Sequence, residues 1–132
     1  MSERERNQAL LAAGIEAYNR ADFEAMAEFF DPEVECHIAS GLGNPGTWHG
    51  LDGFREMTET WRDAFAEDRS EVISASMPDD NHLIAEMRQI AVGSGSGVPV
   101  EMTSVYLLEI RDGRAVRFHI YADRESAMAA VR

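Results

Sequence analysis

Four ionisable residues lie in two segments whose apolar residues alternate as they do in strands. Glu35 and His37 are two positions apart in one segment, and Glu86 and Arg88 are two positions apart in the other. Residues two apart on a strand point to the same face. Burial and neighbouring charges shift the pKa values of such groups toward the range of acid–base chemistry. The alternatives are a structural Glu86–Arg88 ion pair, or rows that face solvent.

Each of these residues has a candidate catalytic role. His37 is the first choice for a general acid or base, because an unperturbed imidazole pKa of about 6.5 suits proton transfer near neutral pH. Glu35 could orient His37 or act as the base itself. Arg88 stays protonated, so it could hold a carbonyl oxygen, a carboxylate or an enolate, with Glu86 as its counter-charge. The alternative for His37 is a purely structural role in its strand.

A ligand pocket is usually lined by hydrophobic and aromatic side chains. The residues expected to bind a substrate, some of which could equally be plain core, are Tyr18, Phe30, Trp48, Trp61, Phe65, Thr103, Phe118 and Ile120. We expect no cofactor. We also expect no metal at Glu35, His37 and Glu86, because no motif fixes a ligand geometry there. The glycine-rich stretches 41–50 and 93–97 indicate flexible connections or pocket lids.

The composition excludes several classes of protein. A chain of 132 residues, 45% hydrophobic and 27% charged, suits one globular domain over 1–132. A net charge of −12 opposes nucleic-acid binding, and the absence of lysine excludes Schiff-base enzymes and phosphate-binding P-loops. No apolar run approaches the roughly 20 residues that span a bilayer, and no secretory signal opens the sequence. We therefore expect no membrane partner and a cytoplasmic location.

Periodicity predicts helices before a sheet. The predicted helices are 5–20, 23–30, 51–67 and 124–130, and the predicted strands are 34–39, 69–77, 82–92, 98–110 and 114–122. Asp22 and Asp123 are expected to cap helices, and Asp112-Gly113 to form a hairpin turn. This order predicts an α+β fold in which the sheet buries one face on the helices.

The hairpin also predicts which side chains share a face. A two-residue turn places Arg111 opposite Arg114, and an uninterrupted ladder then pairs Leu107 with Phe118 and Val105 with Ile120. The opposite face would carry Tyr106, Leu108, Arg117, His119 and Tyr121. Because an uncovered aromatic patch is a liability, we expect a homodimer through this outer face. Its predicted contacts are Tyr106, Leu108, His119 and Tyr121.

Five short fragments follow one another in a fixed order along nearly the whole chain. They are NRADF (19–23), FDPEV (30–34), HGLDGF (49–54), RDGR (111–114) and YADR (121–124). Their order and spacing resemble the SnoaL-like branch of the nuclear transport factor two-like superfamily. The resemblance implies a cone-shaped α+β barrel, in which a curved, mostly antiparallel sheet wraps around three helices, with a pocket between them and often a dimer.

Members of that superfamily include ketosteroid isomerases, polyketide cyclases, limonene-type epoxide hydrolases and binding domains without chemistry. The isomerase general base falls on His37, whereas the helix-one tyrosine of the isomerases falls on Gly14 and their protonated aspartate near Val105. The Arg and Asp of the hydrolases fall on Glu86 and Arg88 in reversed order. The resemblance thus implies a cofactor-independent isomerase, cyclase or hydrolase using acid–base chemistry on an apolar carbonyl, hydroxyl or epoxide compound. The alternative is a non-catalytic ligand-binding or dimerisation module.

Overall fold

A computed structural model describes residues 2–42 and 45–131 of the chain. Its helices are α1 (Glu3–Asn19), α2 (Phe23–Ala27), α3 (Gly50–Asp63) and α4 (Arg124–Val131). Its strands are β1 (Phe30–Ile38), β2 (Gly46–His49), β3 (Phe65–Ser76), β4 (His82–Gly93), β5 (Pro99–Arg111) and β6 (Arg114–Tyr121). The predicted order of elements is confirmed, with β2 as an addition.

The two predicted helix caps are both present. The backbone N–H of Ala25 donates to Asp22 Oδ1 at 3.1 Å, and that of Ser126 donates to Asp123 Oδ1 at 2.8 Å. Each bond satisfies one of the N–H groups that the first turn of a helix leaves without a partner.

Three predicted boundaries are wrong because strand pairing overrides helical periodicity. The predicted helix 23–30 ends at Ala27, since Phe30 already pairs with β6. The predicted helix 51–67 ends at Asp63, since Phe65 pairs with Gly93 of β4. The stretch 41–50 is not wholly a loop, because β2 pairs antiparallel with β1; its residues 43 and 44 lie outside the described residues.

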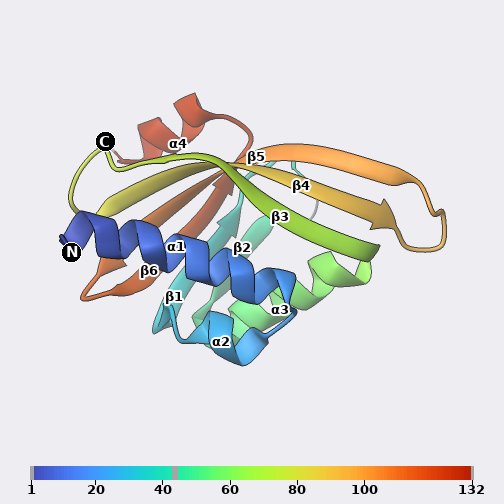
Figure 1. Ribbon diagram of the computed structural model, residues 1–132, viewed down its shortest axis with the longest axis horizontal. Coiled ribbons are helices and arrows are strands. Elements are labelled where there is room, and N and C mark those ends of the chain that lie inside the picture. The colour runs from blue at the N-terminus through green and yellow to red at the C-terminus, as the bar shows by residue number, and fades with distance from the viewer. Residues whose placement is uncertain (1, 43–44, 132) are drawn as a thin grey trace.

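The six strands form one open, mixed sheet in the order β2-β1-β6-β5-β4-β3. The β1–β6 pair is parallel and the other pairs are antiparallel. Figure 1 shows the curved sheet with α1, α2 and α3 on one side and α4 on the other. This arrangement confirms the α+β class, with an inner face toward three helices and an outer face that α4 partly covers.

A bulge in β6 overturns the predicted face assignment. Arg111 lies opposite Arg114 as predicted, but the register shifts by one residue at Val116. Because side chains alternate along a strand, a one-residue shift moves every later pair to the other face. Beyond the bulge, Leu108 therefore pairs with Phe118 and not with His119 or Arg117.

The corrected register changes the expected dimer surface. Tyr106 and Leu108 lie on the inner face with Phe118 and Ile120, so they cannot belong to an outer dimer contact. His119 and Tyr121 remain on the outer face. Their strand partners there are Leu107 and Val105, which the sequence had placed inside.

The buried side chains divide according to these faces. Two core clusters fill the inner side, around Leu83 and Met87 and around Val34 and Cys36. A smaller cluster on the outer face includes Ala127 of α4 and packs it against the sheet. Among the helices of the described residues, none is both long and apolar enough to cross a bilayer.

Candidate functional site

A cavity of about 400 Å³ lies between the helices and the inner face of the sheet. Its apolar wall includes Leu11, Ile15, Met26, Phe30, Phe54, Met57, Leu108, Phe118 and Ile120. Its polar groups come from Tyr18, Thr58, Trp61, Gln89, Ser104 and Tyr106. A mostly apolar cavity with a few placed polar groups is the usual form of a small-molecule site.

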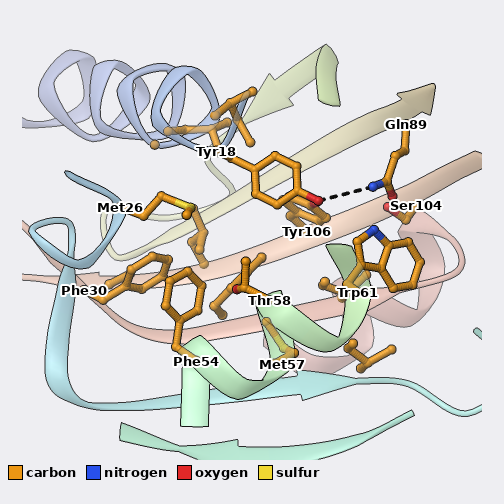
Figure 2. Close-up of a pocket in the computed structure, with 18 of the residues that line it drawn as sticks. Tyr18, Met26, Phe30, Phe54, Met57, Thr58, Trp61, Gln89, Ser104 and Tyr106 are labelled. Carbon is orange, nitrogen blue, oxygen red and sulfur yellow. Dashed lines mark hydrogen bonds between the residues drawn. The ribbon is translucent and has the colours of Figure 1, made fainter. Parts of the chain in front are cut away.

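Several of the polar groups lie toward one end of this cavity. Figure 2 shows the Tyr18 hydroxyl pointing toward Gln89, with Trp61 and Ser104 beside Gln89. Met26, Phe30 and Phe54 lie at the other end of the same view. A ligand with one polar group and an apolar body matches this division.

Asp68 of β3 lies behind the polar end and holds two of its side chains. Its carboxylate accepts hydrogen bonds from the Tyr18 hydroxyl and from Gln89 Nε2. Gln89 Nε2 also lies 3.4 Å from the Tyr18 oxygen. Asp68 itself is not part of the cavity wall. The three side chains form a connected group, here called the Tyr18–Asp68–Gln89 group.

Neighbouring contacts position Tyr18 against Asp68. The Asn19 side chain makes two hydrogen bonds to the backbone of Ser70, at 2.9 and 3.0 Å, and so fixes the end of α1 on β3. The Arg62 guanidinium lies 4.3 Å from the Tyr18 ring centre and donates to the Tyr18 carbonyl. The ring is thereby fixed from two elements, as a preorganised site requires.

Both tyrosines of the cavity wall are neutral phenols near neutral pH. Burial raises the pKa of Tyr18, and the hydrogen bond and negative charge of Asp68 raise it further. Burial likewise raises the pKa of Tyr106 to about 12, with a nearby Ser70 hydroxyl acting against the shift. Tyr18 is therefore a proton donor to Asp68 rather than a phenolate.

A spectrophotometric titration tests these shifts. Burial also raises the pKa of Tyr121, so all three tyrosines of the chain have folded pKa values above the ordinary 10.0. At pH 10, phenolate absorbance should stay below the half-ionised level that urea-unfolded protein reaches. The stabilisation is complete below pH 10 and is lost as pH rises through the folded values. Equal absorbance of folded and unfolded protein at pH 10 would contradict the burial of these hydroxyls.

Six of the eight side chains predicted to bind substrate belong to residues of the cavity wall. They are Tyr18, Phe30, Trp61, Thr103, Phe118 and Ile120. Trp48 and Phe65 are not in it. Trp48 packs on Gly53, where an added Cβ would lie 3.0 Å from the Trp48 Cβ, and Phe65 packs on Trp61 with ring centres 5.6 Å apart.

The four predicted catalytic side chains all lie on the outer face, away from the cavity. On β1, the inner side belongs to the buried Val34, Cys36 and Ile38, so Glu35 and His37 alternate outward. On β4, Glu86 and Arg88 share the row of Ile84, which packs in the outer-face cluster with α4. Both rows of β4 contain apolar residues, so its pattern alone could not tell inner from outer.

The contacts of these residues also differ from the prediction. Arg88 pairs with Glu101 at 3.1 Å and with Glu71 at 3.8 Å, not with Glu86. His37 Nδ1 lies 2.9 Å from the Thr47 hydroxyl. Glu35 Oε2 lies 2.8 Å from His119 Nε2, and His119 Nδ1 lies 3.1 Å from the Tyr121 hydroxyl. The structure places Arg88 on β4, which β6 and β5 separate from the strand of Glu35 and His37, and none of the three residues lies in the cavity wall.

His119, which contacts Glu35 and Tyr121 on the outer face, makes the stability of the protein depend on pH. Burial lowers the pKa of His119 from its ordinary 6.5, against the opposing effect of the hydrogen bond that His119 donates to Glu35. Its stabilising contribution is present above pH 6.5 and is lost as pH falls through the lowered value. Urea unfolding below pH 6.5 should therefore show a smaller loss of stability for His119→Gln than for the wild type. Parallel pH profiles, with His37→Gln as the matched control, would contradict this expectation.

The polar residues of the site that the sequence reasoning missed are Thr58, Asp68, Gln89 and Ser104. Gln89 is a polar residue in the row of Leu83, Ala85 and Met87, and that isolated amide was the available signal. Asp68 offered no signal, because β3 was predicted to begin after it. Among the described residues, no three His, Cys, Asp or Glu side chains are grouped so as to hold a metal ion.

Comparisons with solved structures show that other proteins share this fold. TerC co-crystallised with polyporic acid is 19% identical over 94% of this chain and 96% of its own, with a TM-score of 0.79. A nuclear transport factor two-like protein of unknown function from Burkholderia pseudomallei is 20% identical, over 98% and 97%, with a TM-score of 0.81. A hypothetical protein with a ketosteroid isomerase-like fold from Catenulispora acidiphila, in complex with trimethylamine, is 14% identical, over 91% and 89%, with a TM-score of 0.76.

The sequence itself matches a family. A search of curated proteins found no match to this chain. Residues 11–118, however, match the SnoaL-like domain, and these residues include most of the cavity wall and the whole Tyr18–Asp68–Gln89 group. The chain therefore belongs to the SnoaL-like domain family, with a nuclear transport factor two-like fold.

Proposed function

We propose that this protein binds an apolar small molecule in the cavity and carries out proton transfer on it without a cofactor. The observation that carries the proposal is the Tyr18–Asp68–Gln89 group: a carboxylate held behind a tyrosine at the polar end of an apolar cavity. Substrates of this kind carry a carbonyl, hydroxyl or epoxide on an apolar body. The neighbour that holds polyporic acid and the one that holds trimethylamine support small-molecule binding in this fold.

The acid–base pair in this proposal is Tyr18 and Asp68. The Tyr18 oxygen takes a proton from the substrate while the Tyr18 proton passes to Asp68, so the substrate becomes an anion and Asp68 a neutral acid. Reversal of the relay returns the proton to a different atom of the substrate, which is an isomerisation. A positioned acid–base group contributes about 10²- to 10⁴-fold to a rate.

Hydrogen exchange with solvent tests the proposal without knowledge of the natural substrate. Two probes suffice: 2-tetralone, whose hydrogens beside the carbonyl are acidic, and 2-naphthol, whose C1 hydrogen exchanges through its keto form. The protein should accelerate deuterium incorporation into at least one probe in heavy water, as followed by NMR. No acceleration for either probe would contradict the catalytic proposal.

A non-catalytic ligand-binding module is the second candidate function. It is favoured by the position of Asp68, which Tyr18 and Gln89 separate from the cavity. The two functions differ in one result: a binding module would bind 2-naphthol in calorimetry and leave its exchange rate unchanged.

We also propose that two copies pair through the uncovered part of the outer sheet face, in the cytoplasm. His119 and Tyr121 of β6 and His37 of β1 give this face a half-buried aromatic patch. Tyr121→Arg should shift the sedimentation coefficient from dimer to monomer, whereas an unchanged coefficient would oppose this interface.

A further inference from the structure

The Asp68 carboxylate fixes the hydrogen-bonding direction of its two partners. A carboxylate only accepts hydrogen bonds, so the Tyr18 proton must point at Asp68 and the Gln89 nitrogen must face it. What Tyr18 and Gln89 have left to offer is then determined. The Tyr18 oxygen accepts one hydrogen bond from Gln89 Nε2 and keeps one lone pair for a ligand, and Gln89 offers its carbonyl oxygen, Oε1. Both are acceptors.

These two acceptors belong to one place in the cavity. Tyr18 and Gln89 are both wall residues, and Gln89 Nε2 donates a hydrogen bond of 3.4 Å to the Tyr18 oxygen. Figure 2 draws this hydrogen bond as a dashed line. In the described part of the chain, no hydrogen bond reaches Gln89 Oε1. An acceptor in a mostly apolar cavity is costly to leave without a donor.

The other polar groups of the cavity wall do not remove the need for a ligand donor at Tyr18 and Gln89. The hydroxyls of Thr58 and Ser104 can each donate or accept, so they adapt to either kind of ligand. Tyr106 lies beside the Ser70 hydroxyl, and the indole N–H of Trp61 is a donor of its own. Among the described polar residues of the wall, only those of the Tyr18–Asp68–Gln89 group have their proton positions fixed by a charge.

We infer that the ligand presents a hydroxyl to Tyr18 and Gln89, and that its class is an apolar aromatic alcohol or enol rather than a ketone or ether. This inference rests on the proposed function and specifies its substrate class. The ligand O–H bond supplies the proton that Tyr18 takes, while the Tyr18 O–H proton moves to Asp68. The ligand is left as an oxyanion, toward which the newly formed Tyr18 O–H can donate.

Three probes of similar size test the inference by calorimetry: 2-naphthol, 2-methoxynaphthalene and 2-acetonaphthone. They share a naphthalene body and carry a hydroxyl, an ether or a carbonyl. 2-Naphthol should bind at least about tenfold more tightly than the other two, because only it carries a proton that the two acceptors can share. The preference should fall to within about twofold in Tyr18→Phe and in Gln89→Met, which remove one acceptor each. Tyr121→Phe, the same chemical change on the outer face, should keep it.

The outcomes separate this inference from the proposed function. Equal affinity for the three probes, or tighter binding of 2-acetonaphthone, would overturn the inference and leave small-molecule binding intact. A tenfold preference that survives in folded Tyr18→Phe and Gln89→Met, checked by circular dichroism, would also overturn it. If none of the probes binds, both the cavity as a binding site and the inference are contradicted.

Discussion

Tyr18→Phe is expected to slow deuterium exchange at C1 of 2-naphthol by about 100-fold or more. The change removes the oxygen that receives the ligand proton and leaves the aromatic ring in place under Arg62. Asp68→Asn should have a similar effect, because an amide cannot take up the Tyr18 proton as a carboxylate does. The measurement is the first-order rate of loss of the C1 proton signal in heavy water.

Two outer-face variants are the controls for this result. Tyr121→Phe and His37→Ala should keep the exchange rate within about twofold of the wild type, because neither side chain touches the cavity. A large loss in His37→Ala, with wild-type rates in Tyr18→Phe, would restore the site that the sequence predicted and contradict the present one.

Leu83→Ala is expected to have the largest effect on stability. Leu83 is 0% exposed and packs in the inner core cluster with Met87 and Leu108, so truncation leaves a cavity. Such a change costs about 2–5 kcal/mol, which corresponds to a fall in Tm of roughly 10 °C or more for a domain of this size.

Ile90→Ala is the matched control on the same strand. Ile90 is 43% exposed on the outer face, so its truncation should lower Tm by only a few degrees at most, about 1 kcal/mol or less. Differential scanning calorimetry gives both values. Equal losses in Leu83→Ala and Ile90→Ala would contradict the division of β4 into a buried inner and an uncovered outer row.

Local signals predicted the elements well because each has a local physical cause. Asp22 and Asp123 bind the first-turn N–H groups of the helices they precede, and this depends only on nearby residues. The Arg111–Arg114 pairing at the hairpin likewise follows from its two-residue turn. Where pairing with a distant strand decided the outcome, as at Phe30 and Phe65, periodicity failed.

The sequence prediction misplaced the site residues for a different reason. The bulge at Val116 has no distinct sequence signature, yet it moves Tyr106 and Leu108 from one face of the sheet to the other. Charges drew attention to Glu86 and Arg88, although a charge in a row with Ile84 and Ile90 was compatible with either face. Asp68 was missed because its partner Tyr18 is 50 residues away, a contact that only the tertiary structure brings about.

The most direct test of where the ligand binds is NMR of protein labelled with ¹³C at the methionine methyl groups. Met26, Met57 and Met102 line the cavity, whereas Met128 belongs to α4 and packs on the outer face of the sheet. Addition of 2-naphthol should shift the signals of the three cavity methionines and give Overhauser contacts between their methyl groups and the naphthalene ring, with Met128 unchanged. Shifts and contacts confined to Met128 would contradict the central claim that the inner cavity is the functional site.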